Sequence, residues 1–225
     1  MQSEYLELQS LYEKEGQAVA WNIANILCGT NYIDRCTLIS AAYVLLKSND
    51  NEAVLDDIET FCTSINVNED RKAFLDSHLG DCWQMVAGQR YRYNGNVLKS
   101  IILFHDNRDM RFDVDGRTPA SISHLAYKLF GFDEGGDLAD FGLGSAAFTI
   151  ESFLKNPTLH FYGIEINAAI KEIASIRLEI LGCTITLEHG NIFDLDPNSH
   201  QYQHIFSNYP FGLRLRDIGF DRNRL

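Results

Sequence analysis

The turn on which the fold depends reads Asp140-Phe141-Gly142-Leu143-Gly144-Ser145-Ala146. It follows a segment with the apolar pattern of a strand, at 137–141, and opens a segment with helical periodicity, at 146–154. Glycines in such a turn let the backbone bend tightly and approach a ligand closely, and the free amides at the start of a helix favour negative charge. The stretch therefore predicts a first strand that ends at a ligand site.

Strand-like and helix-like segments alternate around this turn. Further strands are predicted at 159–166, 183–187 and 204–207, and a further helix at 168–181. Strands that alternate with helices of this length need right-handed crossovers, which make the strands parallel. The second half of the chain is therefore predicted to be a Rossmann-like α/β domain with a mostly parallel sheet. We also expect a helix before the first strand, with Thr118 as its capping residue and Pro119 at its first position.

The first half of the chain has a different pattern. Before about residue 105, apolar residues recur at helical spacings, for example within 38–46. Polar, loop-like stretches follow between 106 and 118. We predict a helical N-terminal domain at 1–110 and a ligand-binding α/β domain at 111–225.

Length and composition bound the class of protein. At 225 residues, of which 45% are hydrophobic, the chain can bury a sizeable core. It holds no run of roughly 18 apolar residues, and its N-terminus lacks the cationic and apolar segments of a signal peptide. We therefore expect a cytoplasmic protein with no membrane contact. The five cysteines and seven histidines show no metal-ligand spacing, so no metal site is expected.

The net charge of the chain is −12. Because an acidic surface repels phosphate, the chain is not expected to hold duplex DNA tightly by itself. A role on DNA would need a partner that supplies much of the affinity for DNA.

Polar or special residues lie at the end of every predicted strand. They are Asp140 with Gly142 and Gly144, then Glu165, then Asn191, and finally Asn208-Tyr209-Pro210-Phe211. Because the carboxyl ends of parallel strands meet at one edge of a sheet, where such sheets bind ligands, these residues are expected to form one site.

The glycine pattern alone leaves two nucleotides open. Gly142-x-Gly144-x-x-Ala147 satisfies the dinucleotide fingerprint, and Glu165 suits the ribose of NAD. Asp140 would repel a pyrophosphate, but it can accept hydrogen bonds from the loop or face the cationic end of a methionine moiety. A turn such as Asn208 to Phe211 can grip a planar amino group and stack on its ring. The combination favours a methyltransferase that uses S-adenosylmethionine over a dehydrogenase.

These motifs together resemble the adenine-specific DNA methyltransferases, most of all the methylation subunit of type I restriction-modification systems. The matching segments are 117–119, 140–148, 163–167, 189–191 and 207–212, with 21–27 similar to the helical start of that family. The resemblance implies methyl transfer from S-adenosylmethionine to the exocyclic amine of adenine in DNA. It also implies two partners, a specificity subunit that reads DNA and a restriction subunit.

The resemblance also implies roles for the cofactor residues. Thr118 would meet the cofactor carboxylate, and Asp140, Gly142 and Gly144 would line the methionine pocket. Glu165 would take both ribose hydroxyls. The remaining cofactor residue is Asn191, which would face the adenine of the cofactor.

In the same way, the resemblance implies that the segment after the fourth strand is catalytic. Asn208 would accept a hydrogen from the target amine, and the carbonyl of Tyr209 would accept a second. Pro210 would stiffen the turn, and Phe211 would stack on the flipped base. Flipping costs a few kcal/mol, which stacking offsets.

The chain departs from the family pattern at three places. Tyr209 replaces the first proline of the family motif. Ala146 and Ala147 stand where the family usually has two glycines, so their methyl groups are expected to crowd the cofactor. The sheet of the family continues past the fourth strand, so this chain is expected to hold an incomplete catalytic domain. Two alternatives follow: a non-catalytic partner-binding module with a vestigial pocket, or a methyltransferase that acts on RNA adenine or protein glutamine.

Overall fold

A computed structural model describes residues 118–131, 135–196 and 201–208, together with residues 14, 18, 21, 22, 36 and 102. The chain divides into two compact units, Met1–Asp115 and Gly116–Leu225. The predicted helical domain lies almost wholly outside the described residues, so its helical character and the domain limits 1–110 and 111–225 stay predictions. The fold given below is that of the second unit.

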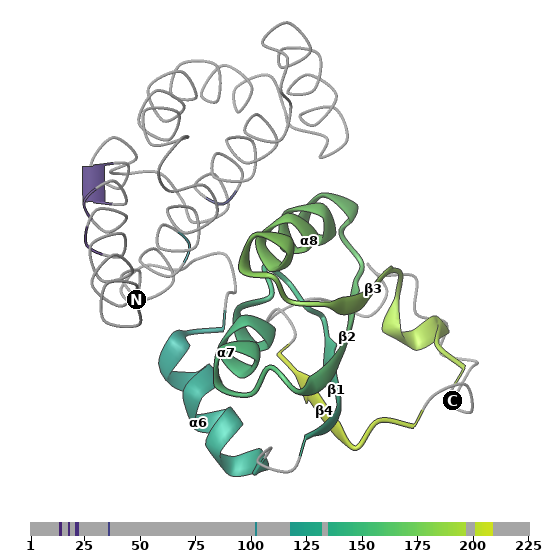
Figure 1. Ribbon diagram of the computed structural model, residues 1–225. Coiled ribbons are helices and arrows are strands. Elements are labelled where there is room, and N and C mark those ends of the chain that lie inside the picture. Colours follow the sequence, from purple (N-terminus) through teal and green to yellow (C-terminus); the bar gives the residue numbers. More distant parts are fainter. Residues whose placement is uncertain are drawn as a thin grey trace, which may run out of the picture. The chain divides into compact units, whose positions relative to one another are not determined.

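Four parallel strands form the sheet of this unit (Figure 1). They are β1 (Gly136–Phe141), β2 (Leu159–Glu165), β3 (Ile185–His189) and β4 (His204–Ser207), in the order β3-β2-β1-β4. Phe141 lies level with Ile164 and Ser207, and Glu165 lies level with His189. All four strands therefore end at the same edge of the sheet, as the sequence predicted.

Three helices lie on one face of the sheet (Figure 1). They are α6 (Ala120–Phe130), α7 (Ala147–Lys155) and α8 (Ala168–Leu181). The chain runs β1-α7-β2-α8-β3, and after the short 3-10 helix η2 (Ile192–Asp194) it returns to β4 on the other side of β1. The direction of strand addition thus reverses between β1 and β4, and open α/β sheets bind ligands at such a reversal.

The predicted limits of α8 and β4 are confirmed, but β3 begins two residues later than predicted. Gly182 ends α8 in a left-handed conformation, and the amide of Cys183 donates to the carbonyl of Leu178 at 2.9 Å. Cys183 therefore still belongs to the cap of the helix and cannot pair with β2. Cys183, the first residue of the predicted strand, serves the helix end instead.

The expected cap of α6 is wrong. The helix begins at Ala120 with Pro119 as its capping residue, and the Pro119 carbonyl accepts hydrogen bonds from Ile122 and Ser123. The side chain of Thr118 makes no capping bond. Its hydroxyl instead accepts a hydrogen bond from Asn208, which is 90 residues away in the sequence.

Aromatic side chains pack on both faces of the sheet. Beneath the helices, the ring of Phe148 in α7 stacks on Phe206 of β4, with ring centres 3.7 Å apart. On the opposite face, the ring of Tyr202 packs edge-on against Phe141. It also packs at a tilt against Tyr162. Burial of a large apolar side chain stabilises a fold by about 1.5–3 kcal/mol. The aromatic clusters therefore stabilise the packing on each face of the sheet. Among the described helices, none has the length and apolar character that a membrane crossing requires.

Candidate functional site

The turn between β1 and α7 depends on two glycines in the left-handed region. The φ angles of Gly142 and Gly144 are 75° and 56°, which glycine adopts without steric cost. The amides of Gly142 and Leu143 both donate to the carbonyl of Ile164 at 3.0 Å, so the turn is anchored on β2. Among the described residues, a Cβ atom at Gly144 would meet only the carbonyl oxygen of Gly142, at 3.9 Å. The described part of the chain therefore leaves space over Gly144 for a ligand.

Glu165, the last residue of β2, holds this turn in place. Its side chain is buried, at 8% exposure, and its Oε2 atom accepts a hydrogen bond from the Gly144 amide at 2.8 Å. Its Oε1 atom accepts from the Asn167 amide, also at 2.8 Å. Each carboxylate oxygen can accept two hydrogen bonds, so the carboxylate has further acceptor capacity. It can hold the loop and bind a pair of ligand hydroxyls together.

Asp140 lies beneath the turn with only 2% exposure. Its Oδ2 atom accepts a hydrogen bond from the Thr149 hydroxyl of α7 at 2.8 Å, so its carboxylate bonds to the helix rather than to the loop. Burial raises the pKa of Asp140 from 3.8 to about 7. Hydrogen bonds from Thr149 act in the opposite direction, and the negative charge of Glu165 adds to the rise. The group is therefore poised between its neutral and charged forms near neutral pH.

Asp140 and Glu165 bond to different partners because they occupy different positions on their strands. Asp140 pairs with Gly163 one step before the strand ends, and its side chain points under α7. Glu165 stands at the strand end, level with the turn. Because Gly163 has no side chain, Leu143 packs over it, and a Cβ there would lie 3.1 Å from Leu143 Cδ1.

Two residues that are distant in sequence meet at the end of β4. Asn208 directly follows the strand, and its Nδ2 atom donates to the Thr118 hydroxyl at 2.9 Å. Thr118 is buried, and Asn208 is half-buried. The hydroxyl of Ser207 donates to the Phe141 carbonyl at 2.8 Å and so ties the end of β4 to β1. The structure thus brings together a residue predicted to bind cofactor and one predicted to be catalytic.

Asn191 lies beyond the end of β3. It begins η2, and its Oδ1 atom accepts a hydrogen bond from the Phe193 amide at 3.1 Å. The amide of the preceding Gly190 donates to the Glu165 carbonyl at 3.1 Å, which keeps this turn beside the end of β2. Tyr209, Pro210 and Phe211 lie outside the described residues, so their roles stay predictions.

Arg177 contributes to the site and was missed in the sequence. It is fully buried in α8, and its Nε atom donates to the Ser145 carbonyl at 3.0 Å. A buried guanidinium is costly unless it is bonded, so this contact fixes the glycine turn from the side of α8. The signal was present: Arg177 lies four residues after Ile173 and four before Leu181, on the apolar stripe of the helix.

Ala146 ends the turn in an unusual conformation. Its φ angle is 65°, and it is the one non-glycine residue with positive φ among those the structure describes. It is fully buried and caps the start of α7. A left-handed alanine costs roughly 1 kcal/mol, so the turn carries local strain at the position where the resembling family usually has glycine.

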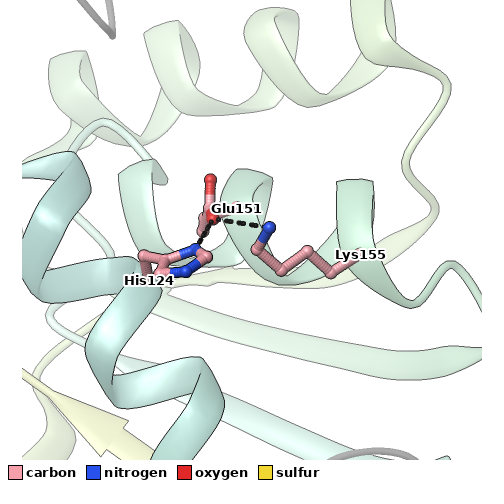
Figure 2. A network of polar contacts seen from close by, with 3 residues as sticks. All are labelled: His124, Glu151 and Lys155. Carbon is pink, nitrogen blue, oxygen red and sulfur yellow. Dashed lines mark hydrogen bonds and ion pairs between the residues drawn. The ribbon is translucent and has the colours of Figure 1, made fainter.

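A polar network joins α6 to α7 on the outer side of the helices (Figure 2). His124 Nδ1 lies 3.1 Å from Glu151 Oε1, and the Lys155 ammonium lies 3.3 Å from the same oxygen. His124 and Glu151 are half-buried and Lys155 is exposed. Ion pairs near a protein surface are worth about 0–1 kcal/mol each, so this network links the two helices without stabilising them strongly.

No protein-family model matches the chain, and no curated protein matches it significantly. Five solved chains do match. One is the crystal structure of a candidate class I S-adenosylmethionine-dependent methyltransferase from Listeria monocytogenes, with a TM-score of 0.53 and 13% sequence identity. This chain therefore shares the α/β fold of that structure. The match covers 87% of this chain and 58% of that chain, so this chain spans little more than half the length of the matching protein.

Proposed function

We propose that the protein transfers a methyl group from S-adenosylmethionine to the exocyclic amine of adenine in DNA, as part of a restriction-modification system. One observation carries the proposal. At the reversal between β1 and β4, the glycine turn held by Glu165 lies next to the end of β4, where Asn208 contacts Thr118. The residues that we assign to the nucleotide and the Asn208 amide that we assign to the amine thus lie at the same edge of the sheet.

The residues at this edge fit S-adenosylmethionine. Glu165 has acceptor capacity for the two ribose hydroxyls, and the open side of Gly144 admits a ligand close to the backbone. Asp140, when ionised, provides negative charge near a sulfonium and an ammonium group. Asn191 is the residue of this edge assigned to the adenine. When bound, the cofactor supplies an electrophilic methyl group on a cationic sulfur.

Asn208 provides the chemistry on the acceptor. The lone pair of an adenine amine is delocalised into its ring and is a poor nucleophile. When the Oδ1 atom of Asn208 accepts a hydrogen bond from the amine N–H, the nitrogen can pyramidalise and its lone pair becomes available to the methyl carbon. Methyl transfer would leave a neutral thioether, and the methylated amine would lose one proton to solvent. This interaction is strongest in the transition state, so it accelerates transfer more than it tightens binding. The reaction needs no cysteine nucleophile.

The acidic chain needs a partner for DNA. With a net charge of −12, it repels phosphate, so we assign sequence reading and most of the DNA affinity to a specificity subunit, with a restriction subunit as a further partner. These partners and a cytoplasmic location belong to the proposal.

The test is transfer of labelled methyl groups to DNA by the full-length protein with its specificity partner. Asn208→Ala should abolish transfer while the dissociation constant of the cofactor stays within a few-fold. Asn156→Ala, which removes an amide at the opposite edge of the sheet, is the matched control and should remain active. Activity in Asn208→Ala would refute the assignment of Asn208. A wild-type assembly that methylates no DNA, but does methylate RNA or a protein glutamine, would refute the substrate.

A further inference from the structure

We infer that Thr118 is a positioning residue for Asn208, and that its hydroxyl holds the Asn208 amide so that the Oδ1 atom faces the target amine. The inference rests on the proposed function. Its observation is the 2.9 Å hydrogen bond from Asn208 Nδ2 to Thr118 Oγ1. The resemblance to adenine methyltransferases implies a different role for Thr118, contact with the cofactor carboxylate.

The direction of this hydrogen bond decides which atom of the Asn208 amide, Oδ1 or Nδ2, is turned toward the target amine. Because an amide is planar, Oδ1 lies on the other side of the group when Nδ2 is turned to Thr118. An amide turned the other way would present its own NH₂ group to an amine, and two donors cannot form a hydrogen bond. Catalytic groups must be held closely to their productive geometry, so orientation of this amide affects rate directly.

Contacts at both ends of α6 hold this helix against β4. This helix lies along β4 in the opposite direction, since Thr118 meets Asn208 at one end and the ring of Phe130 lies 6.3 Å from that of His204 at the other. Phe148 of α7 joins the two elements, because its ring stacks on β4 and lies 6.4 Å from Phe130. These aromatic contacts hold α6, whose start Thr118 precedes, against β4, whose end Asn208 follows.

Polar contacts also restrain the elements next to Thr118 and Asn208. The contact of His124 with Glu151 links α6 to α7 on the outer side, with Lys155 on the same carboxylate (Figure 2). The bond from Ser207 to the Phe141 carbonyl fixes the residue just before Asn208. Thr118 and Asn208 thus each stand beside a restrained element, as a positioning contact requires.

The two roles of Thr118 predict different kinetics. In the full-length protein with its specificity partner, Thr118→Val removes the hydroxyl and keeps the shape of the side chain. If Thr118 positions Asn208, kcat should fall about tenfold or more, with the dissociation constant of S-adenosylmethionine unchanged. Thr118→Ser should restore kcat because it restores the hydroxyl. Thr186→Val, on an exposed position of β3, is the matched control and should be without effect.

A second arm separates positioning from a merely structural role. Because Asn208→Ala is expected to transfer no methyl group, the readout in that background is cofactor affinity: adding Thr118→Val should leave the dissociation constant of S-adenosylmethionine unchanged, since Thr118 acts only through Asn208. Weaker cofactor binding in the double variant would overturn the inference. So would unchanged kcat with weaker cofactor binding in Thr118→Val alone, which would return Thr118 to the cofactor.

The wild-type arm distinguishes the two levels of the proposal. A wild-type assembly without methyl transfer overturns the proposed function and this inference with it. An active wild type with full kcat in Thr118→Val overturns the inference alone. Thermal unfolding confirms that each variant is folded, and Thr118→Ala takes the place of Thr118→Val if that variant fails this check.

Discussion

Replacing Asp140 by asparagine removes a buried carboxyl group whose charged form the fold disfavours. Burial raises the pKa of Asp140 above its ordinary value of 3.8, to about 7. A group with a raised pKa in the folded state contributes stability that is fully present below the unfolded pKa and is lost as pH rises through the folded pKa. The wild-type protein should therefore lose stability between about pH 4 and pH 7 through this residue. Asparagine does not titrate, so the variant should lack this loss.

The magnitude follows from the change in pKa. One pKa unit corresponds to about 1.4 kcal/mol, so a rise from 3.8 to about 7 corresponds to an upper limit of about 4 kcal/mol. Asparagine can still accept the hydrogen bond from Thr149 through its amide oxygen. At pH 4 the two proteins should therefore unfold with similar free energies. At pH 8 Asp140→Asn should be the more stable by up to about 4 kcal/mol.

The assay must report on the second compact unit alone. Urea titrations at pH 4, 6 and 8, followed by hydrogen exchange of peptides that cover β1 and β2, meet this need. The control is Glu172→Gln, which removes a carboxylate that is 45% exposed on α8. If the free-energy difference between wild type and Asp140→Asn changes by less than about 1 kcal/mol from pH 4 to pH 8, Asp140 is already ionised in the fold and the reasoning fails.

Two further predictions concern the turn. Glu165→Gln places an NH₂ group against the donors Gly144 or Asn167, so calorimetric titration should show binding of S-adenosylmethionine weakened about tenfold or more, with no change in Glu172→Gln; equal affinity in wild type and Glu165→Gln would contradict it. Ala146→Gly relieves the left-handed alanine, so urea titration should show stability unchanged or raised by up to about 1 kcal/mol, whereas Ala147→Gly, inside α7, should lower it by about 1 kcal/mol. Equal losses in the two glycine variants would show that Ala146 carries no strain.

Local patterns were enough to predict the described α-helices and strands of the second unit. The limits of α8 were predicted as 168–181, and the structure shows why they hold: the side chain of Asn167 caps the start of the helix, and Gly182 ends it. The order strand, glycine turn, helix predicted the parallel sheet because only right-handed crossovers connect such elements. These features depend on residues within a few positions of each other, and such signals are readable in a sequence.

Contacts between distant segments were not predictable in this way. Thr118 has the sequence of a helix cap, but its hydroxyl pairs with a residue 90 positions away, which no local pattern reveals. Asp140 was expected either to accept hydrogen bonds from the loop or to face the cationic end of a methionine moiety, and its bond from Thr149 of α7 was not foreseen, because the partner depends on which face of the sheet the side chain enters. Arg177 could be recognised in the sequence as a charged residue on the apolar stripe of α8, but its bond to the Ser145 carbonyl could not, because every residue has a backbone carbonyl.

The two contacts of the proposed site close over very different lengths of chain. Gly144 and Glu165 are 21 residues apart, whereas Thr118 and Asn208 are 90 apart. Closing a longer segment costs more conformational entropy, and a ribosome adds residues one at a time from the N-terminus. The Gly144–Glu165 contact can therefore form while the β4 segment is still to be synthesised. Under the proposed function, the part of this edge assigned to the cofactor can thus form before the part assigned to the amine.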